Sequence, residues 1–587
     1  MENIYLYVFP SCAIVLLRRI AMAKVINAGA SCVIAAICDA IGLVEVIDSI
    51  VPWDPSQCKL SPGLRIKALI INILMRRSPL YLVEVFYEHL DVGALFGNLV
   101  SYHDLNDSAL GRALDKLYEA GPEKVFSAVA MNAIFREGVE VDILHGDTTS
   151  WSVTGVYETE EEMGLVEEEA EEEGYEESRP LRITYGYNKN HRPDLKQFKY
   201  GLIVTKDRIP MVGQVRDGDL DDKTWNNRVM ERLASCLSPE ALKKIIYVTD
   251  CALITKDNLE AAKENELKFI SRLPGTFSLE QELKGMAWSR GEWVELGELA
   301  KNKRPDSARY KYQEFSRELY GIEYRFIVVH SSKLDRRKSK KLDRELTAKR
   351  KELQKKAAEL EAIEFACEPD AIVALSRFKK ELENPFFDIS GEVVAEEVPV
   401  KRLRKGRPRK DEVAPTRRVY RVKVLIGELD QEAYREEMER RSCFVLITNI
   451  EDKEAYPASS VVSEYKNQTA IELQFKAIKD PEFVGAMYVK KPERLEALAY
   501  VVLMAALVRS IIERRVRRSL AEKGEPLPLP GKKYSFEPTG EKVLECLDWI
   551  SVIVFEDGRR ELSEYRSFPY KVFEALNLNP SIYIRSP

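Results

Sequence analysis

The sequence predicts an α/β protein with an all-helical N-terminal region, and three observations predict it. Apolar residues recur at helical spacing from Ala28 to about Ile134. Short β-branched or alternating runs follow, with a helical pattern at Trp225 to Leu237 before the last of them: VDILHGDTTS, LRITYGY, FKYGLIVT, MVGQV and IIYVTD. The α/β pattern ends after KFISRL and resumes at CFVLITN (Cys443 to Asn449) and a helix over Glu464 to Lys479. The core is therefore interrupted by an insertion and rejoined.

The length of 587 residues predicts three or four domains, or one core with large insertions, at ~100 to 200 residues per domain. Changes in pattern divide the chain into six parts: a leader or over-extended start (1–22), a helical N-terminal domain (23–136), the first part of the core with an acidic insertion at 158–177 (137–273), an insertion domain with a long basic helix and a basic linker (274–440), the second part of the core (441–525) and a C-terminal segment (526–587).

The composition excludes several classes of protein. With 45% apolar residues the chain is not disordered as a whole. Its longest apolar run, Ala497 to Val508, is twelve residues, whereas a bilayer span takes roughly 20, so we expect no transmembrane helix. The opening residues lack a basic start and a cleavage site, so a secretory signal is not expected. Nine scattered cysteines, no Cys-x-x-Cys pair and five histidines indicate a reducing compartment and argue against structural zinc.

Charge is distributed unevenly along the chain. The net charge is −6, but Glu158 to Glu177 alone carries twelve glutamates and no basic residue. This run is interpreted as a solvated insertion in a loop, and mimicry of nucleic-acid charge is the alternative. Without it the remaining chain holds 89 basic and 83 acidic residues.

Two basic segments lie in the insertion. Lys333 to Ala366 is predicted to be one long amphipathic helix, possibly half of a helical hairpin, whose seam is Leu342, Leu346, Leu353, Leu360 and Ile363. Its basic residues are either a solvated face or an arm that contacts phosphates. Lys401 to Lys410 (KRLRKGRPRK) resembles an AT-hook, and we expect Arg404, Arg407 and Arg409 to contact DNA.

Three carboxylates are candidate ligands of a two-metal site. Asp147 ends the run VDILHGD and Asp250 ends IIYVTD, so both are expected at strand ends. Glu472 lies on the predicted helix after CFVLITN, where Tyr465, Gln468, Glu472 and Lys479 fall within about 60° of one another at 100° per residue. Carboxylates that converge repel one another unless a cation neutralises them, and hard oxygen ligands suit Mg²⁺ or Mn²⁺. Asp147 and Asp250 are 103 residues apart, and Glu472 follows 222 residues later, so their convergence is inferred.

Five motifs resemble a known family. HGDTTS, GYNKNHRPDLKQ, PMVGQVRDGDLDD, YVTDCALIT and YKNQTAIELQFKAIK are similar to those of the Asp-Asp-Glu transposases of bacterial and archaeal insertion sequences. The resemblance covers roughly Ala28 to Val516, and it is to the branch with a Tyr-x2-Arg-x3-Glu-x6-Lys signature. The signature arginine is Gln468 here, which replaces a charge-assisted phosphate contact by a neutral one.

The resemblance implies a ribonuclease H-like mixed-sheet catalytic core with a large insertion between the second aspartate and the glutamate. It implies that Asp147, Asp250 and Glu472 are catalytic and bind two Mg²⁺ or Mn²⁺ ions, with Asp147 bridging them. Tyr465, Gln468 and Lys479 match positions that contact DNA. His145, His191 and Asp194 also lie near or within these motifs. His145 is either a neighbour of the metal site or a satisfied core histidine, and the other two are interpreted as loop-structuring residues.

The implied function is cut-and-paste transposition, in which end cleavage by water precedes strand transfer to target DNA. The expected partners are double-stranded DNA, comprising terminal inverted repeats and target, and a second copy in a homodimer on DNA, with no membrane. The expected location is the bacterial or archaeal cytoplasm, at the nucleoid. Two alternatives stay open: an inactive or repurposed DNA-binding protein, and a nuclease on the same core that cuts without strand transfer.

Overall fold

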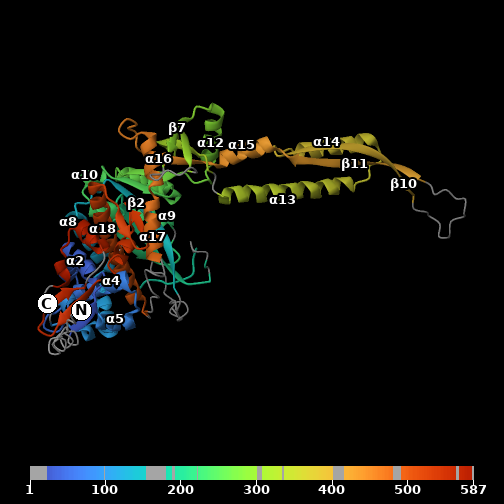
Figure 1. The fold of residues 1–587 in the computed structure, drawn as a ribbon. Coiled ribbons are helices and arrows are strands. Elements are labelled where there is room, and N and C mark those ends of the chain that lie inside the picture. The colour runs from blue at the N-terminus through green and yellow to red at the C-terminus, as the bar shows by residue number, and fades with distance from the viewer. Residues whose placement is uncertain are drawn as a thin grey trace, which may run out of the picture. The chain divides into compact units, whose positions relative to one another are not determined.

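The computed structural model describes residues 23–97, 99–153, 180–187, 192, 194–220, 222–299, 307–333, 336–400, 416–479, 489, 491–563 and 567–584. The chain divides into two compact units. Unit 1 combines residues up to Ser271 with those from Glu464 onward, and unit 2 is the continuous stretch Arg272–Ser463. Figure 1 shows the elements of both.

Unit 1 begins with one strand and a set of short helices, as the helical spacing predicts. Asn106 caps α7 by accepting a hydrogen bond from the Ala109 backbone N–H at 2.9 Å. The elements are β1 (Ala23–Asn27), α2 (Ser31–Ala40), α3 (Leu43–Ile50), α4 (Pro62–Met75), α5 (Val83–Glu88), α6 (Val92–Phe96), α7 (Asp107–Glu119) and α8 (Pro122–Arg136), with 3₁₀ turns η1 (Leu80–Leu82) and η2 (Tyr102–Leu105).

A mixed sheet follows in the order β4-β3-β2-β5-β6. β3 is antiparallel to β2 and β4, whereas β5 is parallel to β2 and to β6. The predicted strand at LRITYGY is wrong, since Thr184 there forms only an isolated bridge to Gln197. The elements are β2 (Ile143–Ser152), β3 (Gln197–Thr205), β4 (Pro210–Arg216), α9 (Asp222–Cys236), α10 (Pro239–Leu242), β5 (Ile246–Thr249), η3 (Cys251–Leu253), α11 (Lys256–Glu264) and β6 (Lys268–Arg272).

α18 (Pro492–Lys523) is the central helix of unit 1. By length and composition it could cross a membrane, with a mean hydropathy of 2.0 over its most apolar window, but 89% of that window is buried inside the protein. It packs against α4, α7, α8 and β4. The arginine-rich end that follows the apolar stretch forms ion pairs, for example Arg515 with Glu137 at 2.5 Å. This helix therefore joins the helical N-terminal region to the sheet.

The C-terminal segment completes unit 1 rather than standing apart from it. β15 pairs with β1 in antiparallel register, and the Tyr583 hydroxyl donates a hydrogen bond to the Gly29 carbonyl at 2.7 Å. α20 packs against α18. The elements after the insertion are α17 (Thr469–Lys479), β13 (Leu527–Leu529), β14 (Lys533–Ser535), α19 (Gly540–Glu545), β15 (Ser551–Phe555), β16 (Arg560–Leu562), α20 (Ser567–Leu576) and η4 (Pro580–Tyr583).

Unit 2 contains an antiparallel run of strands in the order β12-β9-β8-β7. Its elements are α12 (Ser278–Arg290), β7 (Val294–Glu298), β8 (Arg309–Leu319), β9 (Ile322–Ser331), α13 (Arg336–Glu361), α14 (Glu368–Glu381), β10 (Phe387–Pro399), β11 (Thr416–Leu429), α15 (Gln431–Arg441) and β12 (Cys443–Thr448), with α16 (Ala458–Lys466) at its end.

The predicted long helix is present as α13, but the helical hairpin is wrong. α13 and α14 both lie along the two-stranded β10–β11 hairpin, which supplies the apolar surface that the helix seam needs (Figure 1). Leu342, Leu346 and Leu353 are buried in one cluster with Phe387 from β10. Ile363 lies beyond the end of α13 and is 47% exposed, so it is not part of the seam.

Candidate active site

The two predicted aspartates lie side by side on neighbouring parallel strands. β2 and β5 pair in register with Gly146 opposite Thr249, and Asp147 and Asp250 are the next residues along each chain. Adjacent strands are about 4.8 Å apart. Both side chains are half-buried. The structure therefore brings these two carboxylates together.

Only one of the two aspartates ends a strand. Asp250 follows β5 directly, as predicted, whereas Asp147 lies in the middle of β2. The prediction for Asp147 is wrong because the Thr, Ser and Trp residues after it continue to pair with β3, from Thr148 opposite Gly201 to Ser152 opposite Gln197. Such residues are good strand formers.

Backbone groups fix the position of each carboxylate. The Thr148 N–H donates to Asp147 Oδ1 at 2.7 Å, and the Ala252 N–H donates to Asp250 Oδ1 at 3.0 Å. Asp250 thereby caps the short turn after β5, and its carbonyl accepts a hydrogen bond from the Ser271 hydroxyl at 2.6 Å. Asp250 can therefore form this turn and also bind a cation.

Tyr247 supports the same region of the sheet. Its hydroxyl donates to Asn226 Oδ1 of α9 at 3.1 Å. Burial raises the pKa of Tyr247 far above its ordinary value, and the negative charges of Asp250 and Asp147 raise it further. The phenol therefore stays protonated and holds α9 in place.

Glu472 lies on α17, which packs against β2 and β3. The buried side of this short helix is fixed by Gln474, whose side-chain amide donates to the Arg208 carbonyl at 2.8 Å and to the Ser510 hydroxyl at 2.6 Å. Glu472 itself is exposed. Lys479 is half-buried, and seven residues of helix place it on the face of Glu472.

Across the part of the chain that is described, no three His, Cys, Asp or Glu side chains are placed to hold one metal ion. Glu472 thus lies on the helix beside the strand of Asp147 without joining the two aspartates. The chemistry of the pair nevertheless fits a divalent cation, because two carboxylates at strand spacing offer the hard oxygen ligands that Mg²⁺ and Mn²⁺ prefer.

The predicted continuous helix over Glu464 to Lys479 is wrong, so helical spacing no longer assigns Tyr465 and Gln468 to the face of Glu472 and Lys479. The helix is interrupted at Asn467 and Gln468, between α16 and α17. The Gln468 N–H bonds to the Tyr465 carbonyl at 3.2 Å, which closes a turn instead of continuing the α-helix. Asn is a poor residue for a helix interior, and this was the signal in the sequence.

Other predicted residues have separate outcomes. Arg404, Arg407, Arg409 and His191 lie outside the described residues, as do the leader at 1–22 and the acidic run at 158–177. Asp194 is exposed and forms an ion pair with Arg192 at 2.7 Å.

His145 is fully buried, and neither ring nitrogen has a hydrogen-bond partner among the described residues, so it is not a satisfied core histidine. Burial lowers its pKa to about 4.

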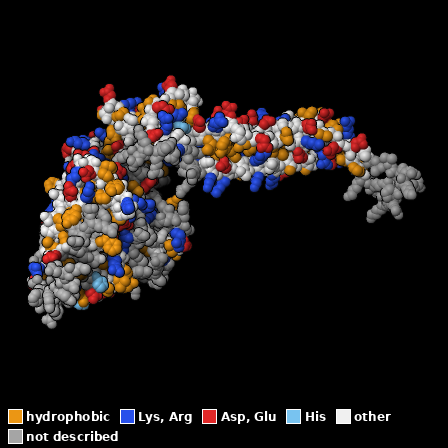
Figure 2. Space-filling view, in the orientation of Figure 1, with side chains coloured by type: hydrophobic (Ala, Val, Ile, Leu, Met, Phe, Trp, Pro, Cys, Tyr) orange, Lys and Arg blue, Asp and Glu red, His pale blue; other side chains and the backbone are white. Residues whose placement is uncertain are grey.

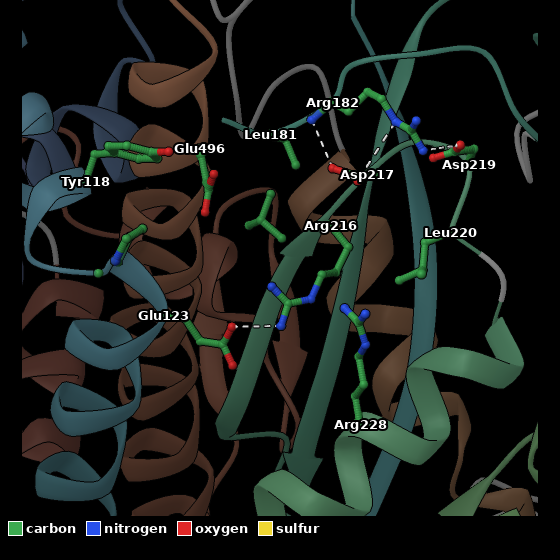
Figure 3. Close-up of a pocket in the computed structure, with 13 residues that line it drawn as sticks. Tyr118, Glu123, Leu181, Arg182, Arg216, Asp217, Asp219, Leu220, Arg228 and Glu496 are labelled. Carbon is green, nitrogen blue, oxygen red and sulfur yellow. Dashed lines mark hydrogen bonds and ion pairs between the residues drawn. The ribbon is translucent and has the colours of Figure 1, made fainter. Parts of the chain in front are cut away.

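A cavity of about 500 Å³ opens in unit 1 at the carboxyl end of β4 (Figure 3). Arg216, the last residue of β4, reaches Glu123 of α8 at 3.1 Å. Across the cavity, Arg182 pairs with Asp219 at 2.6 Å. Glu496 of α18 also lines it. Sequence pattern could not predict this site, because its residues come from five separate segments whose meeting depends on tertiary packing.

Glu496 is a titratable group near neutral pH. Burial raises its pKa from 4.5 to about 7, against the opposing effect of Arg216. Between about pH 4.5 and pH 7 the Glu496 carboxyl is protonated in the folded protein but ionised in the unfolded chain. The resulting stabilisation is complete below about pH 4.5 and is lost as the pH rises through about 7.

Glu496→Gln is therefore expected to raise the melting temperature at pH 8 and to raise it much less at pH 5. The amide stays neutral, so the variant avoids a cost of at most about 3 kcal/mol for burying the charge. Thermal unfolding followed at several pH values measures the difference. Glu522→Gln, on the same helix with a side chain 63% exposed, is the control and should show no such pH dependence. A gain of equal size at pH 5 and pH 8 would contradict the prediction.

Comparisons with known proteins match only part of the chain with a family. Residues 24–131 match a family described as "Domain of unknown function (DUF4277)". No curated protein matches. Among solved structures, a piggyBac transposase synaptic complex with hairpin DNA has a TM-score of 0.35 at 10% identity, over 87% of this chain and 79% of that chain. A pre-cleavage Mos1 transpososome has a TM-score of 0.14 at 10% identity, over 39% of this chain and 64% of that chain. Neither score by itself establishes a common fold.

Proposed function

We propose that this chain is a DNA transposase of the Asp-Asp-Glu type that cuts the ends of an insertion sequence and joins them to target DNA. One observation carries the proposal: Asp147 and Asp250, which stand in two of the five family-like motifs, lie side by side on adjacent parallel strands. Residues 103 positions apart have no reason to meet at the same level of a sheet unless the fold requires it. A mixed sheet in which β2, the strand of Asp147, lies between antiparallel β3 and parallel β5 supports a ribonuclease H-like core.

In this proposal Asp147, Asp250 and Glu472 hold two Mg²⁺ or Mn²⁺ ions. When bound, such a pair activates water and stabilises charge on the attacking and leaving oxygens of a phosphodiester. The backbone N–H groups of Thr148 and Ala252 keep the two aspartates in place for that role. Glu472 approaches from α17, which Gln474 anchors to α18. Lys479 shares the face of Glu472 and contacts a phosphate near the cut end.

Recognition of DNA is assigned to other parts of the chain. The helical N-terminal region reads the terminal inverted repeats, and Tyr465, Gln468 and the basic insertion contact the backbone. Because two ends must be joined to one target, the active form is a homodimer on DNA. The protein acts in the cytoplasm, at the nucleoid.

A DNA-binding protein without catalysis is the second candidate. It is favoured by the replacement of the signature arginine by Gln468 and by the position of Glu472 outside the aspartate pair. Such a protein would bind the same ends and leave them intact.

Cleavage of a duplex that carries the element's own ends tests the proposal. The wild-type protein is expected to nick this duplex only with Mg²⁺ or Mn²⁺, and Glu472→Ala is expected to lower the rate by at least ~10²-fold while binding persists. The matched control is Glu464→Ala in α16. Binding without cleavage by the wild type would replace the transposase by the non-catalytic candidate, and cleavage without joining would indicate a nuclease.

A further inference from the structure

Eight of the basic residues of α13 fall into two sets of four, and the first set is paired. Four of its cations have acidic partners along the flanks of the helix: Lys341 with Glu345 at 3.9 Å, Lys349 with Glu352 at 3.3 Å, Arg350 with Glu428 at 3.1 Å and Lys356 with Glu352 at 2.9 Å. Pairs of this kind are the ordinary means of keeping an exposed helix soluble and stable. They need no ligand to explain them.

The second set, which we name the cationic line, consists of Lys340, Arg344, Lys351 and Lys355. All four side chains are exposed, and none forms an ion pair with any residue that the structure describes. At 100° per residue they fall within about 60° of one another, directly opposite the buried seam of α13. Figure 2 shows blue side chains along this edge of the helix.

Uncharged residues occupy most of the face that carries the cationic line, and its nearest acid is Glu359, about 40° beyond Lys355 at 100° per residue. The residues that share it are Thr347, Ala348, Gln354 and Ala358, all of them uncharged. Among the acids of α13, Glu345 and Glu352 lie on the flanks and pair with cations of the first set. Asp343 instead accepts a hydrogen bond from the Tyr434 hydroxyl, and Glu361 accepts one from the Val424 N–H. A helix that merely needed solubility would mix both signs around its exposed surface. The separation of the two sets therefore favours a polyanionic ligand for this face.

The dimensions of the cationic line suit duplex DNA. Its four residues span about 22 Å at 1.5 Å per residue, which equals six or seven base pairs of about 3.4 Å. They form two pairs, and the gap of about 10 Å from Arg344 to Lys351 is close to the width of the major groove, about 12 Å. Small or uncharged side chains occupy that gap.

We propose that the cationic line of α13 binds the phosphate backbone of double-stranded DNA, with one pair of cations on each side of a groove. The choice of DNA as the polyanion rests on the proposed function, whereas the separation of charges on the helix does not. Contacts of this kind position the duplex and carry no base sequence.

Two charge-matched variants test the inference. The line variant combines Lys340→Gln, Arg344→Gln, Lys351→Gln and Lys355→Gln. The paired variant combines Lys341→Gln, Lys349→Gln, Arg350→Gln and Lys356→Gln, and it removes the same charge from the same helix. Binding to a labelled duplex of about 30 base pairs is measured against KCl concentration in EDTA, where no cleavage occurs.

The line variant is expected to lose about 3 to 4 units of slope in log K against log salt, at about 0.9 per phosphate, and the paired variant less than 1. Equal slopes in the two variants, or an unchanged slope in the line variant, would overturn the inference. Helix content by circular dichroism checks folding. If the line variant unfolds, the double variant Lys351→Gln, Lys355→Gln replaces it and should lose half as much.

The proposed function and this inference can fail separately. A protein that binds through the cationic line but cuts no DNA in Mg²⁺ would contradict the transposase assignment alone. A protein that cuts its ends normally while the line variant keeps the full salt dependence would contradict the inference alone.

Discussion

Asp147→Asn and Asp250→Asn are each expected to lower Mg²⁺-dependent DNA cleavage by on the order of 10³-fold or more. The amide keeps the shape of the side chain and can still accept the hydrogen bond from Thr148 or Ala252, so the fold should survive. What it loses is the negative charge that a divalent cation requires. Initial rates of nicking on end-bearing duplex measure the effect, and combining the two changes should add little because both ligands serve one site.

Asp142→Asn is the matched control for these variants. Asp142 directly precedes β2, is 48% exposed and pairs with Lys206 at 2.7 Å. Its replacement removes the same charge five residues earlier, just before the strand begins, and should leave cleavage unchanged. Equal losses in Asp142→Asn and Asp147→Asn would show that general charge near the sheet, not a metal site, controls the rate.

Gly201→Ala is expected to destabilise unit 1 by about 3 kcal/mol, near the upper end for overpacking a core. A Cβ at this position of β3 would lie 1.9 Å from Nε1 of Trp225, the side chain through which α9 packs on the sheet. Trp225 is 2% exposed, so its ring cannot move aside without displacing its neighbours. Denaturant unfolding measures the loss, which should appear as a lower midpoint with an unchanged slope.

Gly285→Ala is the matched control, because it makes the same substitution but is expected to stabilise the protein. Gly285 lies within α12, and a Cβ there meets nothing within 4 Å. Alanine is the better helix former, so this variant should be stabilised by up to about 1 kcal/mol. If Gly201→Ala were as stable as the wild type, the close packing of Trp225 on β3 would be wrong.

The sequence predicted those parts of the molecule that depend on local pattern. The runs that became β2, β3, β4, β5, β6 and β12 are apolar or alternating, and the helices before them follow a helical spacing. The runs placed Asp147 and Asp250 on strands, but their meeting on adjacent strands remained an inference that the structure supplies.

Features set by tertiary contacts could not be predicted from pattern. The seam of α13 indicated an apolar partner but could not distinguish a helix from the β10–β11 hairpin, since both offer apolar surface. The helical spacing of apolar residues runs through Asn467 and Gln468 without a gap. Predicting the break there would have required giving one poor helix former, Asn467, more weight than that spacing. The cavity beside Glu496 depends on segments that only the complete fold brings together.

The pairing of β1 with β15 sets the order in which a newly made chain can fold. Residues 23–27 have no strand partner until Ser551–Phe555 leave the ribosome. At 5 to 20 residues per second that delay is roughly half a minute to two minutes. Unit 2 is a continuous stretch that ends at Ser463, 88 residues before Ser551, so all its own contacts are available earlier. During synthesis the insertion can therefore fold first, while unit 1 waits for its C-terminal segment.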